Sequence, residues 1–296
     1  MSIARACRLL GYSKQAWHKG RQNSRRKTGA RCRQAGAVLA KVDEIRKEMP
    51  RLGVRKLKHL LDAEQIPIGR DRLFDLLRDH DLLVEKRKKR FRTTDSTNWL
   101  RQFDNLVEDR APTKPEETWV ADITYFQTEE EGAVYGHFVT DAYSKKVMGH
   151  EVAADMKAET CKKALLMGLS KRRYKHGLIH HSDRGMQYCS KTYTEAVEKN
   201  SGRVSTTQTG SPYENAVAER LNGILKEEFG LDAKLKNLQE VQQKVERAIE
   251  IYNHKRPHLS CHLLTPEQMH QQQSLPCKTY RKKNKPITKE PEKTPQ

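Results

Sequence analysis

The sequence predicts an α/β protein in which a mixed five-stranded sheet, flanked by helices, follows an all-helical region of helix-turn-helix type. Residues 1–93 place apolar side chains at helical spacing, whereas from Thr118 onward the spacing becomes two, which is typical of strands. Between them, residues 111–115 contain two prolines and mark a linker. The change of period at this linker is the reason for predicting two regions of different architecture.

The first twenty residues predict a helix pair. Residues 2–10 have one apolar face, Gly11 follows as a stop, and Ser13 suits the cap of a second short helix. This outline resembles a helix-turn-helix that would offer Lys14 and Lys19 to DNA, although an ordinary helical hairpin fits equally well. We expect a basic connector next, and then a helix over about residues 37–48.

A second helix pair is predicted on either side of a turn at residues 66–69. Apolar residues at helical spacing precede and follow this turn, and Arg55 and Arg70 are its candidate DNA contacts. An unbroken basic run comes after it. Such a run is usually a solvated linker, but it also suits DNA, so we include its members as candidate contacts: Arg87, Lys88, Lys89 and Arg90.

Beyond the linker, three strands precede a helix, and strands and helices then alternate. The predicted strands are residues 119–126, 134–143, 146–153, 177–181 and 203–207, and the predicted helices are 157–169, 191–200, 213–229 and 238–252. This order describes a mixed sheet flanked by helices, the layout of a ribonuclease-H-like fold. We expect a helical DNA-binding region (1–93), a linker (94–115), a catalytic domain (116–272) and a basic disordered tail (273–296).

The formal net charge of +19 points to a polyanionic partner. Residues 1–100 hold 26 Lys and Arg against 11 Asp and Glu, whereas residues 101–277 hold 24 against 25. The six cysteines are scattered, and no apolar run approaches the roughly 18 residues of a membrane span. We therefore expect free thiols, no membrane association and a cytoplasmic, nucleoid-associated protein.

Two aspartates occupy positions that suggest chemistry. Asp122 lies inside an otherwise apolar and aromatic strand, where an unpaired carboxylate costs several kcal/mol and calls for a partner or a cation. Asp183 ends a second apolar strand, just before the turn residues Arg184 and Gly185. Functional side chains collect at such strand ends.

A third acid is expected from the helix at residues 213–229. At 100° per residue, Ala218, Leu221, Leu225 and Phe229 form an apolar stripe, and a separate polar stripe consists of Asn215, Glu219, Asn222 and Lys226. Glu219 is the acid of the polar stripe. We take its three polar neighbours as candidate DNA contacts, and we expect Lys226 to contact the phosphate backbone of the DNA.

Three carboxylates of this kind favour Mg²⁺ or Mn²⁺ over zinc. Two such ions, roughly 4 Å apart, activate an attacking oxygen and stabilise a leaving oxygen at a phosphorus. The alternative is that each acid is an ordinary salt-bridged residue. His181 shares a strand face with Asp183 and is either a phosphate contact or a structural histidine, and Asp141 is a rival acid taken as structural.

A resemblance to a known family rests on these residues. Thirty-five residues separate Asp183 from Glu219, and the surroundings of the acids also match: Trp119, Thr124 and Tyr125 near Asp122, the run from His181 to Gly185, and Asn215-Ala216 and Leu225-Lys226 around Glu219. The sequence resembles insertion-sequence transposases of the OrfB type, whose catalytic domain is similar to that of retroviral integrases. Glu214 and the run Arg220-Leu221-Asn222 depart from the commoner pattern without touching the three acids.

The resemblance implies a transposase that cleaves DNA at element ends and transfers strands by 3′-hydroxyl attack. Its implied catalytic and metal-binding residues are Asp122, Asp183 and Glu219, with two Mg²⁺ or Mn²⁺ ions. Implied partners are double-stranded DNA (element ends and target), further copies of the chain, and an upstream helix-turn-helix protein or frameshift fusion. The alternatives are a non-catalytic DNA-binding regulator derived from a transposase, and a ribonuclease-H-like nuclease.

Overall fold

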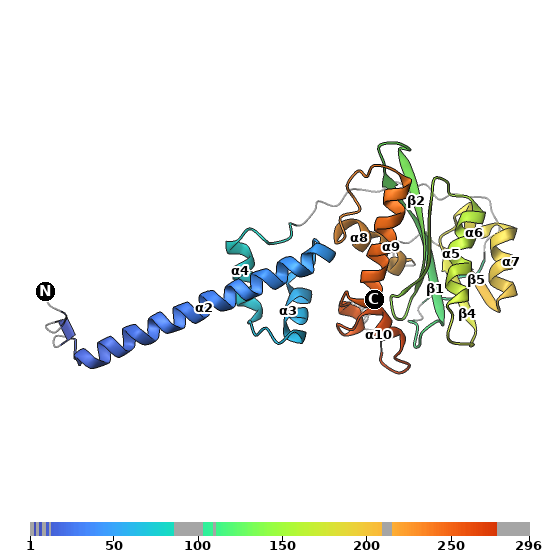
Figure 1. The fold of residues 1–296 in the computed structure, drawn as a ribbon. Coiled ribbons are helices and arrows are strands. Elements are labelled where there is room, and N and C mark those ends of the chain that lie inside the picture. The colour runs from blue at the N-terminus through green and yellow to red at the C-terminus, as the bar shows by residue number, and fades with distance from the viewer. Residues whose placement is uncertain are drawn as a thin grey trace, which may run out of the picture.

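The structure, a computed structural model, describes residues 3, 6–7, 10–11, 13–85, 103–108, 111–208 and 215–276, with the side chains of 23–31 left aside. The basic run at residues 87–90 and the tail after residue 276 lie outside these ranges. In the described part, a helical amino-terminal region packs against one side of a layered α/β body (Figure 1). No helix in these ranges combines the length and apolar character needed to cross a bilayer.

The amino-terminal region contains one long helix where the sequence predicted two elements and a connector. Helix α2 spans Lys14–Glu48 without a break, 35 residues or about 50 Å at ~1.5 Å per residue. The predicted cap is confirmed, because the Ser13 side chain accepts a hydrogen bond from the backbone N–H of Ala16. The prediction of a connector before residue 37 is wrong. The glycines there cost only about 1 kcal/mol each, and no proline occurs before Pro50.

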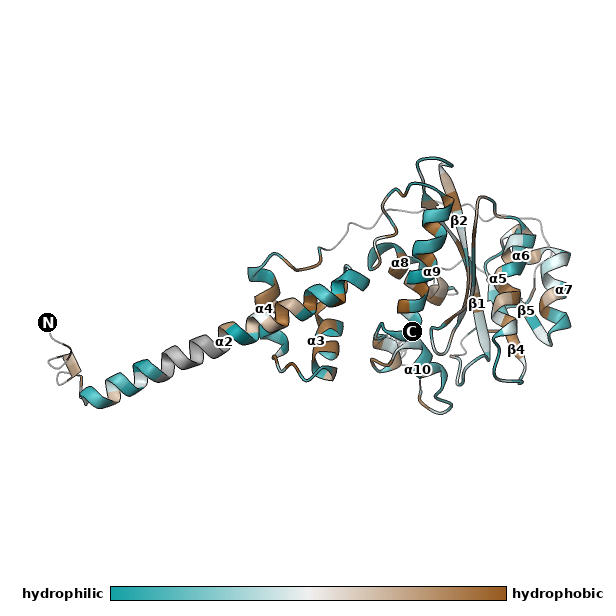
Figure 2. Ribbon diagram, in the orientation of Figure 1, coloured by the Kyte–Doolittle hydropathy of each residue, from teal (hydrophilic) through white to brown (hydrophobic). Residues whose placement is uncertain are grey.

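The second helix pair is present as predicted. Helices α3 (Val54–Ala63) and α4 (Arg70–Asp79) pack against the carboxyl-terminal half of α2 around a cluster of buried apolar residues that includes Val42, Leu57 and Leu73. Figure 2 shows the apolar sides of α3 and α4 turned toward this half of α2, whereas the first turns of α2 are hydrophilic. Among the described side chains of α2, the members of this apolar cluster therefore lie in its carboxyl-terminal half.

The body is built on a five-stranded sheet in the order β3-β2-β1-β4-β5. The strands β1, β2 and β3 pair antiparallel, and β4 and β5 join β1 in parallel. Their bounds are close to the predicted ones: Thr118–Gln127, Ala133–Asp141, Val147–Ala153, Leu178–Ser182 and Gly202–Thr206. This strand order and the pairing directions confirm the predicted ribonuclease-H-like mixed sheet.

Helices cover both faces of the sheet (Figure 1). On one face, Trp119 and Ala121 of β1 pack with α5 (Ala158–Ser170), α6 (Met186–Cys189) and α7 (Lys191–Lys199). On the other face, Phe126 and Phe138 pack with helices α8 (Ala216–Glu227) and α9 (Leu238–His254). A short 3-10 helix, η1 (Leu259–Cys261), and α10 (Pro266–His270) complete the described chain.

A buried ion cluster joins the helical region to the body. Lys56 of α3 bonds both carboxylate oxygens of Glu228 at 2.8 Å, and Arg256 bonds the same two oxygens at 2.9 Å. Burial would raise the pKa of Glu228, but Arg256 and Lys56 outweigh it and lower this pKa to about 2. Burial and the charge of Arg256 lower the pKa of Lys56 to about 8. Arg256 therefore contributes most to stabilising the charged form of Glu228. The pair with Glu228 does not fully offset the cost of burying the charged Lys56.

Candidate active site

The strand register brings the two predicted aspartates side by side. Strands β1 and β4 run parallel, and their last hydrogen-bonded partners are Ala121 and Ser182. Asp122 and Asp183 are the next residue on each strand. Since neighbouring strands lie about 4.8 Å apart, the two carboxylates start from adjacent backbone positions at the carboxyl end of β4. The sheet thus makes neighbours of two aspartates that are separated by sixty residues of the chain.

The two aspartates differ in their surroundings. Asp122 is buried, and its Oδ2 accepts a hydrogen bond from Nδ2 of Asn222 at 2.7 Å. Asp183 is exposed, and its Oδ1 accepts a hydrogen bond from the backbone N–H of Gly185 at 3.0 Å. A Cβ at position 185 would lie 3.0 Å from this same oxygen, so glycine leaves room for the Asp183 carboxylate. One carboxylate is held by protein, and the other faces solvent.

The polar stripe of α8 lies against β1 through its two asparagines. Nδ2 of Asn215 donates to the backbone carbonyl of Ala121 at 3.0 Å, one residue before Asp122. Two turns further along, Asn222 contacts Asp122 itself, so the expectation that the run Arg220-Leu221-Asn222 touches none of the three acids is wrong. Near the end of α8, Nζ of Lys226 lies 4.3 Å from the centre of the Tyr125 ring. The side chain of Tyr125 is about half exposed, so a cation and an aromatic ring lie together at the surface three residues along β1 from Asp122.

Glu219 sits on this stripe between Asn215 and Asn222, one helical turn from each, and it is exposed. Within the part of the chain that the structure describes, no three His, Cys, Asp or Glu side chains are gathered closely enough to hold a metal ion. The structure therefore brings Asp122 and Asp183 together and places Glu219 on the helix face that borders them, without joining all three carboxylates in one cluster.

Several candidate DNA contacts prove to be engaged within the protein. His181 is completely buried and its Nδ1 lies 2.9 Å from Oγ of Ser205, which fits the structural alternative and leaves no surface for a phosphate. Asn215 and Asn222 are also buried, and both bond β1. These two amides position α8 on the sheet at the site.

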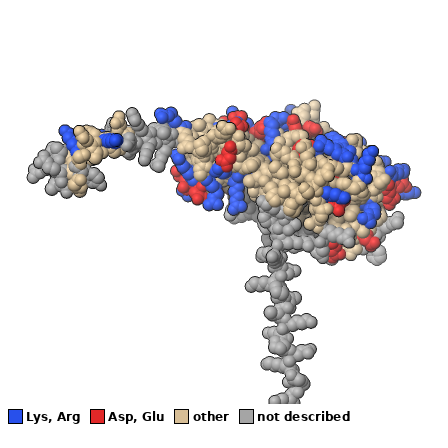
Figure 3. All heavy atoms as spheres, turned by 90° about the horizontal axis from the view of Figure 1, so that it is seen from below, with Lys and Arg blue, Asp and Glu red and all other residues tan. Residues whose placement is uncertain are grey.

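Other candidates lie on the surface of the helical region. Lys14 and Lys19 are exposed on the projecting half of α2, Arg55 is exposed on α3, and Arg70 is exposed on α4, where it pairs with Asp71 at 2.8 Å. Figure 3 shows Lys and Arg along α2 and over this face of the body, with Asp and Glu among them. On this face, the positive charge is dispersed rather than collected in one stripe.

A buried polar network explains the rival acid. Asp141 accepts hydrogen bonds from the backbone N–H groups of Glu116 and Ser144, both at 2.8 Å. His270 of α10 lies between the two carboxylates, with Nε2 at 3.2 Å from Glu116 and Nδ1 at 3.5 Å from Asp141. Ser144, His270 and Glu116 are arranged like a nucleophile, base and acid, but all are inaccessible to solvent. The network ties α10 to the sheet.

Sequence reasoning did not identify Glu116 and His270. Thr265 and Gln268 form the capping box that starts α10, but this local signal does not indicate that His270 is part of a buried network. His254, His258 and His262 recur every four residues, a spacing at which histidines on one helix can form a zinc site. Helix α9 ends at His254, so the three histidines do not share one helix.

The comparisons with known proteins agree with this geometry. Two family models, both described as integrase core domain, match residues 112–212 and 201–266. The body of the chain is thus an integrase core domain. Among curated proteins, the chain is 34% identical over 257 residues to an insertion element IS600 protein of Shigella sonnei, covering 85% of this chain and 92% of the relative.

Named transposases are similar at comparable levels. Identity is 32% to the transposase of insertion sequence element IS629 of Shigella sonnei (72% of this chain, 74% of the relative) and 30% to transposase InsF for IS3A of Escherichia coli K12 (90% and 93%). The chain therefore belongs to the family of insertion-sequence transposases with an integrase core domain.

Solved structures also resemble the chain. One is a simian T-cell lymphotropic virus intasome in complex with a phosphatase regulatory subunit (19% identity, TM-score 0.47, 78% of this chain and 75% of that chain). Another is the HTLV-2 integrase catalytic core domain in complex with magnesium (20%, TM-score 0.43, 53% and 97%). The fold assignment itself rests on the strand order and the family match.

Proposed function

We propose that this chain catalyses metal-dependent DNA cleavage at the ends of its element and then strand transfer, using Asp122, Asp183 and Glu219. The observation that carries the proposal is the register of β1 and β4, which makes the two aspartates neighbours at the end of β4. Family membership and the position of Glu219 beside Asn222 on α8 support it further.

The donor set fits two Mg²⁺ or Mn²⁺ ions. Carboxylate oxygens are the hard ligands that these ions prefer, and one relative in the integrase fold is described in complex with magnesium. When bound, the ions would polarise the phosphate and lower the pKa of an attacking water or 3′-hydroxyl. Asp183 and Glu219 are exposed and so accessible to ions from solvent, whereas Asn222 keeps the buried Asp122 aligned.

The chemistry requires DNA as partner. Lys226 and the exposed Tyr125 ring lie along β1 from Asp122, where a phosphate and a base next to the scissile bond would be positioned. Joining two element ends requires at least two protomers, so we propose a homo-oligomer assembled on DNA. Such an enzyme would act in the cytoplasm at the nucleoid, alone or with an upstream helix-turn-helix partner.

The test uses the purified full-length chain and a duplex that carries the inverted repeat flanking its reading frame. We expect Mg²⁺- or Mn²⁺-dependent nicking that EDTA prevents, and joining of the freed 3′ end to a target duplex. Asp183→Asn should abolish nicking and leave DNA binding intact. Asp43→Asn, an exposed aspartate of α2, is the matched control and should behave as wild type.

Two outcomes would favour the alternatives. One observation favours a non-catalytic regulator. Glu219 is exposed, and in the described chain it does not belong to any group of three carboxylates. DNA binding without nicking in either metal would support that function. Nicking without joined products would instead indicate a nuclease of the ribonuclease-H class.

A further inference from the structure

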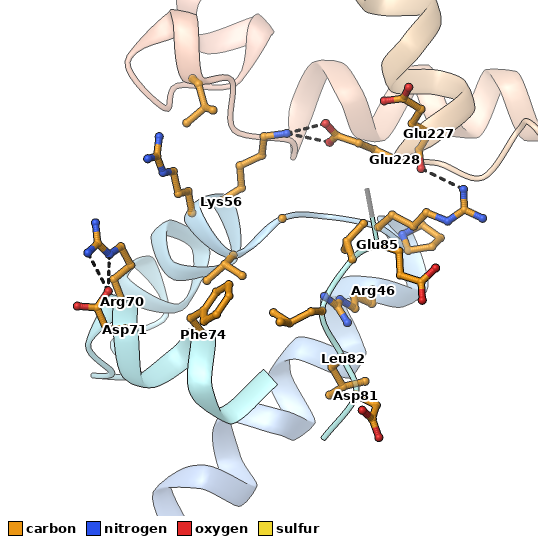
Figure 4. A pocket seen from close by; sticks show the side chains of 18 of the residues that line it. Arg46, Lys56, Arg70, Asp71, Phe74, Asp81, Leu82, Glu85, Glu227 and Glu228 are labelled. Carbon is orange, nitrogen blue, oxygen red and sulfur yellow. Dashed lines mark hydrogen bonds and ion pairs between the residues drawn. The ribbon is translucent and has the colours of Figure 1, made fainter. Parts of the chain in front are cut away.

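A large cleft separates the helical region from the body. It has a volume of about 1240 Å³. One side is lined by α3, α4 and residues 81–85. The other side is lined by Arg220 and Glu227 of α8 and by Glu228, the residue that follows this helix. Figure 4 shows Arg46 and Phe74 directed into this cleft, with Lys56 and Glu228 paired at its edge. The cleft is distinct from the aspartate pair, which lies on the opposite, β1-facing side of α8.

Arg46, in the last turn of α2, is the unusual residue of the cleft. Its Nε and Nη2 atoms are buried and have no hydrogen-bond partner among the residues that the structure describes. Burial accordingly lowers the pKa of its guanidinium. The residue as a whole is partly exposed, so an anion that enters the cleft can reach it. The two buried N–H groups cost free energy while they lack an acceptor, and a bound anion would recover part of that cost.

The remaining cations of the cleft differ from Arg46 because most are already paired. Lys56 pairs with Glu228 at 2.8 Å, Arg70 with Asp71 at 2.8 Å, Arg51 with Asp232 at 3.2 Å, and Arg220 with Glu228 at 3.3 Å. Arg55, exposed on α3, is the other lining cation for which the described residues provide no ion pair. The cleft lining thus contains two cations, Arg46 and Arg55, that are available to incoming anions.

We propose that Arg46 and Arg55 bind backbone phosphates of duplex DNA in this cleft. The proposal rests on the proposed function, because it takes the DNA to be the substrate. Asn222 of α8 contacts Asp122, while Arg220 and Glu227 of the same helix line the cleft. The two places are therefore within roughly 20 Å, or about six phosphates of one strand at ~3.4 Å spacing. A 30-base-pair duplex, about 100 Å long at ~3.4 Å per pair, is long enough to reach both.

The lining contains its own competitors for Arg46. Asp81 and Glu85 also face the cleft, and neither forms an ion pair with a described residue. The carbonyl end of α2 offers a second structural reason for a cation at this place. Both explanations give Arg46 a role in stability alone, so they predict that its removal lowers the melting temperature and leaves DNA affinity unchanged.

The experiment measures binding of a fluorescent 30-base-pair duplex of mixed sequence to the full-length chain in EDTA, across a series of KCl concentrations. Cleavage is not needed, so failure of the proposed catalysis would leave this result interpretable. Arg46→Met should weaken binding about 10- to 100-fold and reduce the slope of log K against log salt by about 0.9. The melting temperature of the free variant should be unchanged or higher. Arg78→Met, a cation of α4 outside the cleft and paired with Asp75, is the matched control with the wild-type slope.

Three results would overturn the proposal. The first is wild-type affinity and slope for Arg46→Met. The second is that inorganic phosphate alone stabilises the wild type while Arg46→Met keeps the wild-type slope of log K for DNA against log salt. The cleft would then be a site for small anions. The third applies if Arg46→Met loses both stability and DNA affinity. Arg55→Met, at an exposed position, should then lower the salt slope by itself. A wild-type slope for Arg55→Met would refute the site.

Discussion

Nδ2 of Asn222 donates a hydrogen bond of 2.7 Å to Oδ2 of Asp122, joining α8 to β1 at the point where Asp183 is adjacent. This bond orients the buried aspartate, so Asn222 is a positioning residue. Asn222→Ala should raise the Mg²⁺ concentration needed for half-maximal nicking by about 10- to 100-fold, the usual effect of removing a partner of a metal ligand. DNA binding in EDTA should stay unchanged.

The control for this variant is Asn237→Ala, which removes the cap of α9 away from the site. It should lower stability without changing the Mg²⁺ dependence. An unchanged Mg²⁺ requirement in Asn222→Ala would show that Asp122 needs no such alignment.

The junction of the helical region and the body depends on Glu228. Its pKa of about 2, against 4.5 in the unfolded chain, makes its contribution present above pH 4.5 and lost as the pH falls toward 2. Glu228→Gln should therefore reduce the free energy of unfolding at pH 7 by about 3 kcal/mol, since two buried cations lose their partner. Denaturant unfolding at pH 7 and at pH 3 should show the difference from wild type narrowing at the lower pH.

Glu48→Gln is the matched control at the same junction. Glu48 pairs with Arg247 at 3.1 Å in a partly exposed setting, and such pairs contribute less than about 1 kcal/mol. An equal loss in the free energy of unfolding for the two variants would mean that burial does not strengthen the ion pairs of Glu228.

His270 gives the body a pH dependence of the opposite sign. Burial lowers the pKa of His270, but hydrogen bonds with Asp141 and Glu116 outweigh it and raise the pKa above 6.5. Its contribution is fully present below pH 6.5 and is lost as the pH rises through the raised value. His270→Ala should cost about 3 kcal/mol at pH 6 and less at pH 9, measured by denaturant unfolding. His254→Ala, at an exposed position, should show no such trend.

The sheet and its helices could be predicted closely because their periodicity is strong. The predicted strand at 119–126 is observed as Thr118–Gln127, and the predicted helix at 238–252 as Leu238–His254. The pairing of Asp122 with Asp183 needed the strand register, which depends on contacts between distant segments. Periodicity alone did not determine it.

The failures have physical causes too. Helix α2 is continuous because good helix formers outweigh its glycines, a balance that local turn signals misjudged. The network of Glu116 and His270 joins residues 154 positions apart, and no local pattern marks either of them. Arg46 looks like any surface arginine in the sequence, and only packing shows that two of its guanidinium nitrogens are buried.

The most direct test of the account concerns Glu219, the acid that lies on the α8 face beside the aspartates but apart from them. The measurement is the rate of Mg²⁺-dependent nicking of element-end DNA by Glu219→Gln, beside Glu227→Gln, an exposed acid of the same helix. We predict a loss of at least about 10³-fold for Glu219→Gln, roughly 4 kcal/mol in the barrier, with a near wild-type rate for Glu227→Gln. Nicking by Glu219→Gln at the wild-type rate would contradict a three-carboxylate active site.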